Sequence, residues 1–179
     1  MSIKTLPLIL FFVAFTLLHA SCQSKEEKEK YEASLKESLN SVRMGSNILD
    51  NQLTRQLDLC SLTLASLKSQ FPGKQIDADI NELGNLQVDF KNARKDILPE
   101  DPNDKNINLD KIDKYIQHSS TIVGKAINKI QADPSLTGNS NISDLAVQLK
   151  GTLNRVTTAR ADMQTKVTQH NKNFPKDKI

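Results

Sequence analysis

A single apolar stripe in the N-terminal half of the chain constrains the fold more than any other feature. From Ser24 to Phe71, apolar side chains recur at steps of three and four residues, with one polar slot near Ser46. The mean step of about 3.64 residues fits a straight α-helix better than a left-handed coiled coil. Pro72 and Gly73 then end the pattern. The stripe predicts one long, nearly straight helix. Its members are Tyr31, Leu35, Leu39, Val42, Leu49, Leu53, Leu57, Cys60, Leu64, Leu67 and Phe71.

Three shorter amphipathic segments follow. The second segment covers about residues 76–98 and precedes a proline-containing loop at 99–106. The third covers about 107–132 and stops before Pro134. The fourth covers about 142–174 and is closed by a proline. In each segment the apolar residues again recur at helical spacing, so each is expected to bury one face.

The four segments predict an all-α fold, arranged as an elongated antiparallel, up-down-up-down four-helix bundle with a long first helix. We expect the bundle to cover residues 39–175 and a short C-terminal tail to cover 176–179. Asn141 or Ser143 is expected to cap the fourth helix, because short polar side chains accept hydrogen bonds from free N–H groups. Each buried Leu or Ile contributes roughly 1.5–3 kcal/mol, enough in sum to offset the ordering of the chain.

Residues 1–21 have the pattern of a secretory signal. Lys4 precedes an apolar run from Leu6 to Leu18, and two small residues stand directly before Cys22. The run is shorter than the ~20 residues of a membrane-spanning helix, so a cleaved signal is favoured over an uncleaved anchor. A cysteine at the cut site predicts a bacterial lipoprotein, lipidated on Cys22. His19 stands where such signals prefer Leu, and this departure resembles the looser signals of some Gram-negative bacteria.

The lipid on Cys22 would hold the chain stably, because several acyl chains bind a membrane far better than one. We expect this lipid to hold the chain at the outer membrane of a Gram-negative bacterium, on either the periplasmic face or the surface face. The next residues include the charged run SKEEKEK, and the first helix is longer than the fourth, which leaves them without a partner helix. Residues 22–38 are therefore predicted to be a lipid-anchored charged stalk, helical or disordered.

Charge and cysteine content exclude some classes of function. Removal of residues 1–21 takes away Lys4 and no acidic residue, so the formal net charge falls by one from +3 to +2. This charge is too small to favour nucleic acid or an acidic partner. With Cys22 lipidated, Cys60 has no disulfide partner, and its place on the apolar stripe predicts a buried, inert thiol.

The sequence offers no metal or catalytic cluster. His118 and His170 lack a second ligand at metal-binding spacing, so both are expected to be partly exposed helix residues rather than zinc ligands. The stretch 101–112 resembles a calcium loop, but Asn106 replaces its glycine and Ile112 its final Glu. We therefore expect no cofactor and no enzymatic activity. A hydrolase ranks last among three hypotheses, after an interaction module and a surface lipoprotein that binds external molecules.

Four motifs occur in order along the chain: QLTRQLDL at 52–59, Ala93-Arg94, DPSL at 133–136 and NRVTTARADMQTKVTQHN at 154–171. Together they resemble the LemA family of bacterial envelope proteins over about residues 40–174. The departures are Ser46 for a Trp, residues 60–62 for Ile-Pro-Asn, and Met163 and His170 for two Tyr. The chain thus looks like a divergent member.

The resemblance implies a membrane-anchored helical bundle that faces out of the cytoplasm and has no established enzymatic activity. Family members usually have an N-terminal transmembrane helix, which lipidation of Cys22 would replace. Some members are associated with HtpX-type membrane metallopeptidases, which implies an accessory or interaction role. The alternative is a surface-exposed lipoprotein that binds host or environmental molecules.

The family-like motifs contain the candidate contacts with a partner, which are Arg55, Arg94, Arg155, Arg160 and Asn171. For the arginines, a second interpretation is ion pairing across helices with Asp50, Asp58, Asp89 or Asp162. We favour ion pairing, because such surface pairs are common and individually weak.

Overall fold

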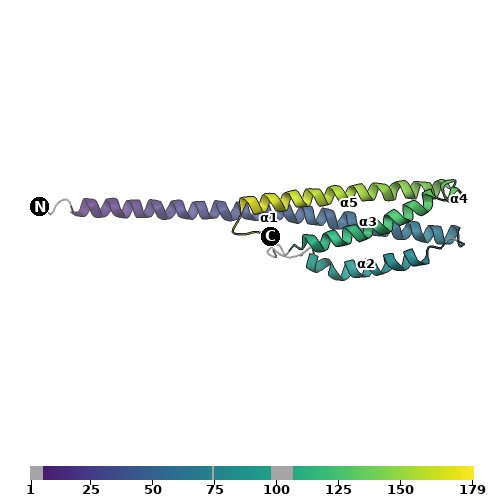
Figure 1. Cartoon of the computed structure of the whole chain (residues 1–179). Coiled ribbons are helices and arrows are strands. Elements are labelled where there is room, and N and C mark those ends of the chain that lie inside the picture. Colours follow the sequence, from purple (N-terminus) through teal and green to yellow (C-terminus); the bar gives the residue numbers. More distant parts are fainter. Residues whose placement is uncertain (1–5, 74, 98–106) are drawn as a thin grey trace. The chain divides into compact units, whose positions relative to one another are not determined.

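All regular secondary structure in the described part of the chain is helical in the computed structural model (Figure 1). The structure describes residues 6–73, 75–97 and 107–179, with side chains from residue 25 onward except those of 95–97. The helices are α1 (Leu6–Gln70), α2 (Asp77–Ile97), α3 (Leu109–Gln131), α4 (Pro134–Thr137) and α5 (Ser140–Asn173). The predicted helical class and long first helix are confirmed, whereas the loop expected at 99–106 lies outside the described residues.

The helix ends follow from local chemistry. The last residue of α1 is Gln70, two residues before the Pro72-Gly73 pair that ends the sequence pattern. The side chain of Asn108 caps α3 by accepting a hydrogen bond from the Lys111 N–H at 2.9 Å. At α5 the cap is Asn139, which accepts from the Ile142 N–H at 3.2 Å. The expected caps Asn141 and Ser143 are wrong, because both lie inside the helix.

The short helix α4 was not predicted. The sequence predicts only the end of the third segment at Pro134, but this residue occupies the first turn of α4, where its missing N–H and fixed φ are compatible with a helix. Asp133 caps this turn, since its carboxylate accepts from the Ser135 N–H at 3.0 Å. Leu136, only 3% exposed, joins α4 to the core. α4 contacts both α3 and α5.

The chain separates into two compact units, residues 1–39 and 40–179. In the first unit the backbone of the predicted stalk, 22–38, is helical, and all side chains from 25 to 34 are exposed. Pairs of opposite charge stand four residues apart there, such as Glu26 and Lys30 with an N···O distance of 2.6 Å. Such pairs stabilise a helix by roughly 0.3–0.5 kcal/mol each, so this charged segment is supported as a helix without burial.

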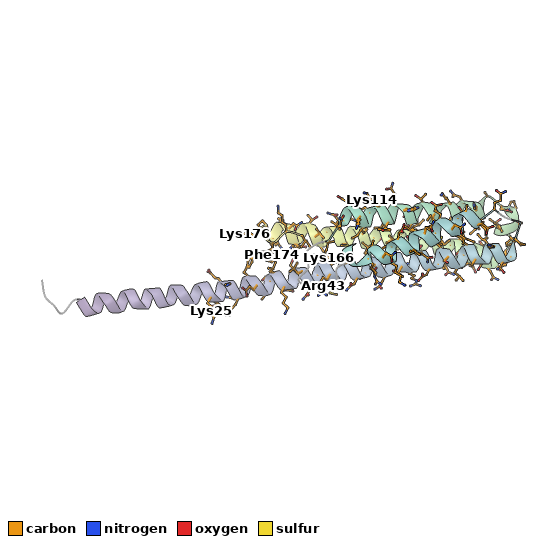
Figure 2. All side chains as sticks on the ribbon, turned by 90° about the horizontal axis from the view of Figure 1, so that it is seen from below. Lys25, Arg43, Lys114, Lys166, Phe174 and Lys176 are labelled. Atoms are coloured by element: carbon orange, nitrogen blue, oxygen red, sulfur yellow. The ribbon has the colours of Figure 1, made fainter. Side chains whose placement is uncertain are left out.

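The core of the second unit is built from the predicted apolar stripes. Charged side chains such as Lys114 and Lys176 lie on its outside (Figure 2). α3 packs against both α2 and α5, so it contributes to the core from the middle of the chain. The largest of the fully buried side chains are Leu49, Leu53, Leu64, Leu67, Leu83, Ile122, Ile130, Ile142, Leu149, Met163 and His170.

The polar slot near Ser46 is a site of close contact between α1 and α5. Gly45 and Ser46 are both buried. A Cβ added to Gly45 would lie 3.4 Å from the Met163 Cα and 3.0 Å from the Lys166 Cδ. The Ser46 hydroxyl donates to the Val42 carbonyl at 3.1 Å, so burial leaves it satisfied. Small residues interrupt the stripe here because a larger side chain would hold the two helices apart.

Cys60 is fully buried on the core face of α1, which confirms the predicted structural thiol. Burial, aided by the nearby charge of Asp79, raises the pKa of Cys60 from 9.0 to about 12. The thiolate is the reactive form of cysteine. The thiol is therefore protonated and inert at neutral pH.

With Cys22 replaced by Ser, Cys60 is the only thiol of the chain. We expect maleimide to modify it at pH 8 at least about 100-fold more slowly in the folded chain than in urea, because both burial and the raised pKa oppose reaction. The folded state holds the thiol proton more tightly than the unfolded state. The corresponding stability is complete below pH 9.0 and is lost as the pH rises toward about 12. Equal rates of modification in buffer and in urea would contradict this burial.

Candidate functional site

A groove of about 710 Å³ lies between α1 and α5 within the unit 40–179. Its main residues are Arg55, Asp58 and Leu62 from α1, and Val147, Gly151 and Arg155 from α5. Residues three, four or seven apart lie on one face of a helix, so the spacing of these residues brings each set to the same wall. The groove therefore joins two of the four arginines that the sequence singled out.

The two arginines lie on opposite walls of the groove. Arg55 and Arg155 are both exposed, and neither forms a hydrogen bond or ion pair with any residue that the structure describes. The guanidinium of Arg155 folds back over α5, because its Nη1 lies 3.3 Å from where a Cβ on Gly151 would be. For these two residues the ion pairing that we expected with aspartates is absent among the described side chains.

Exposed apolar side chains line another part of the groove. Leu62 on α1 is 57% exposed and Val147 on α5 is 69% exposed. Leu62 stands seven residues after Arg55, and Val147 eight residues before Arg155, so about two helical turns separate the apolar pair from the arginines. Sequence reasoning missed both residues. The available signal was that each is a large apolar residue outside the stripe of its helix.

Arg94 belongs to another surface, where it pairs with Asp50 of α1. The Asp50 side chain is only 5% exposed, whereas that of Arg94 is 55% exposed. The second carboxylate oxygen of Asp50, Oδ1, is buried and has no hydrogen-bond partner among the described residues. The predicted ion pair with Asp50 is confirmed, and Arg94 compensates a buried charge.

Arg160 pairs with Asp113 of α3 through two hydrogen bonds of 2.5 and 2.8 Å. The bonds to Asp113 hold the pKa of the Arg160 guanidinium above its ordinary value, although partial burial opposes this shift. Asp113 is not one of the four aspartates that the sequence suggested, and the one that stands nearest to Arg160 in the sequence, Asp162, has another partner. It stands two residues along the same helix and so points to another face, where it pairs with Lys166 at 2.5 Å.

Asn171 holds the C-terminus of the chain. Its side chain donates to the Ile179 carbonyl at 3.1 Å and accepts from the Ile179 N–H at 2.9 Å. His170 is fully buried, and its Nε2 donates to the Asp177 carbonyl at 2.8 Å. The expectation of a partly exposed His170 is therefore wrong, and the side chain of Asn171, a predicted partner contact, is engaged within the chain.

His118 is exposed, as expected, and lies beside Glu82 of α2 at 3.3 Å. Lys125 donates to the same carboxylate at 2.8 Å, and this hydrogen bond lowers the pKa of Glu82 more than desolvation raises it. Within the described residues, no group of three or more His, Cys, Asp or Glu side chains could hold a metal ion. The cluster is best understood as an exposed ion pair between α2 and α3.

Cys22 belongs to α1, but its side chain lies outside the described residues. Among the described helices, none is long and apolar enough to cross a membrane. Comparison of the chain with protein-family models, curated proteins and solved structures finds no match.

The two paired arginines should differ in their effect on stability. We expect Arg94→Ala to lower the free energy of unfolding by about 1–3 kcal/mol, because it leaves the buried Asp50 carboxylate uncompensated. Arg160→Ala should cost less than about 1 kcal/mol, because its partner Asp113 is half exposed. Urea denaturation measures both values.

A second substitution separates loss of charge compensation from loss of packing. Asp50→Asn added to Arg94→Ala should recover roughly half of the lost stability or more, because a buried amide costs less than a buried charge. No recovery, or an equal cost for both arginine variants, would contradict the role assigned to Arg94.

Proposed function

We propose that this chain is a non-enzymatic, membrane-anchored envelope lipoprotein of the LemA type that acts as an interaction module. The groove between α1 and α5 carries the proposal. It combines two arginines that lack partners among the described residues with the exposed Leu62 and Val147. Arginine is enriched at protein interfaces, and exposed apolar patches mark sites of association.

The interaction module is, in this proposal, an up-down-up-down four-helix bundle of the C-terminal part of α1 with α2, α3 and α5. Contacts between the helices support this arrangement, because in each pair of neighbouring helices the early residues of one contact late residues of the other. These contacts are Ser46 with Met163, Gln70 with Asn139, Lys68 with Asp77, Asp50 with Arg94, Lys129 with Asp79 and Tyr115 with Asp89.

A lipid on Cys22 would keep this module at the outer membrane of a Gram-negative bacterium, with residues 22–38 as the stalk. The helical and fully charged character of residues 25–30 supports a spacer that needs no partner. The expected partner is another envelope protein, such as a membrane metallopeptidase of the HtpX type. If the lipid instead faces the medium, the same groove would bind host or environmental molecules.

The anchor can be tested on the two cysteines of the chain. Cells that express the full chain are fed an alkyne analogue of palmitate, and the labelled protein is read on a gel. Cys22→Ser should abolish the label and release the chain from the membrane fraction. Cys60→Ser is the matched control and should keep both. Labelling of Cys22→Ser at the level of the parent chain would exclude the lipoprotein proposal.

The interaction role is tested by photo-crosslinking in intact cells. A benzophenone amino acid at position 147 should yield a discrete crosslinked product, because Val147 lines the groove. The matched control is position 88 on α2, since Val88 is 59% exposed and outside the groove. Mass spectrometry of the crosslinked peptides identifies the partner segment. Identical products from positions 147 and 88, or none from 147, would count against an interface in this groove.

A further inference from the structure

We propose that the occupant of the α1–α5 groove is an amphipathic helix of a partner protein that carries carboxylates about two turns from an apolar anchor. This inference rests on the interaction role proposed above and adds the chemistry of the partner. It follows from three features of the groove: the arrangement of its arginines, the place of its apolar residues and the glycine beneath Arg155.

The charges of the groove call for an anionic occupant. Arg55 and Arg155 face it from both walls, whereas Asp58 is the one acidic residue in its lining. Both guanidinium groups lack a partner among the described side chains. A guanidinium binds a carboxylate with two parallel hydrogen bonds. A Glu or Asp side chain of the partner therefore satisfies each arginine better than a solvent-exposed backbone carbonyl would.

The apolar residues call for a helix rather than a flat surface. Leu62 and Val147 lie on facing walls, about two turns from the arginines. A concave space between two helices accepts the apolar face of a third helix, whose side chains at positions i, i+3, i+4 and i+7 reach along it. The partner helix therefore presents Leu-like residues at one point and carboxylates roughly seven residues away. An anionic membrane, being flat, leaves the floor of the groove unfilled.

The absence of a side chain at Gly151 leaves room for the guanidinium of Arg155 beside the groove. Glycine is disfavoured inside a helix relative to alanine, yet Gly151 lies well within α5. The Arg155 guanidinium lies over the space where a Cβ would be, with its Nη1 at 3.3 Å. Gly151→Ala therefore pushes this guanidinium aside by a few tenths of an ångström while the helix gains a better helix former. The variant changes the groove without unfolding the chain.

The test selects partner chemistry directly. The full chain in phosphatidylcholine nanodiscs is presented to a displayed library of helical peptides in which surface positions vary among Leu, Ala, Gln, Glu and Lys. We expect selected peptides to carry Glu at least about fivefold more often than Lys at positions two turns from paired Leu residues. On the Arg55→Glu, Arg155→Glu variant the preference should invert to Lys. An unchanged Glu-to-Lys ratio, or a selection that returns no peptide, overturns the proposal.

Matched variants separate an effect on the groove from loss of stability and from binding to a membrane. Gly151→Ala should weaken the selected acidic peptide at least about threefold without lowering the melting temperature. Gly124→Ala is the control, because a Cβ there meets open space, and it should leave binding unchanged. Arginine-dependent binding to phosphatidylglycerol vesicles without peptide binding would replace the helix by a membrane and overturn the proposal. A crosslinked partner segment without carboxylates would also overturn it, yet would leave the interaction role intact.

Discussion

The close packing of α1 on α5 is the contact on which the rest of the described structure depends. The two helices approach closely because Gly45 and Ser46 place no large side chain between α1 and the Met163 backbone. The apolar stripe of α1 is buried at Val42 before this point and from Leu49 to Leu67 after it. Because one face of α1 is buried in the core, the residues at the edge of that face line a surface groove beside α5. Arg55 and Leu62 are among these residues.

A buried polar pair ties α1 to α3 as well. The Ser119 hydroxyl donates to the Gln56 Oε1 at 2.9 Å, and both side chains are fully buried. A shift of α1 along α3 by one turn would leave the Gln56 oxygen buried without a partner, at a cost of about 1–3 kcal/mol. Ser119 would keep the Ile116 carbonyl of its own helix, which lies at 2.9 Å, as an acceptor. Apolar packing tolerates such shifts more easily, so this pair contributes register rather than net stability. Fixed register matters for the groove, whose two walls must keep their arginines level.

The features that sequence predicted well are those decided by neighbours along the chain. The C-terminal end of α1 and the extents of α2 and α3 followed from apolar spacing and from breakers such as Pro72, because both act within a few residues. The start of α1 at Leu6 did not follow, because the pattern began only near residue 24. The burial of Cys60 followed from its place on the stripe. Pro134 was misjudged because the same residue suits the end of one helix and the start of another. Local rules alone do not choose between these two roles.

The features that sequence missed are decided by contacts across the fold. His170 is buried because the segment that follows α5 folds back over it, and no periodicity records that return. Arg160 pairs with Asp113 on α3, which the sequence analysis did not suggest, because the packing of α3 against α5 brings the two residues together. The candidate site belongs to the same class. Its arginines were identified by motif, but their meeting with Leu62 and Val147 depends on the register of α1 and α5. A binding surface made by two helices is thus a property of their alignment, which is why small residues and one buried polar pair matter to it.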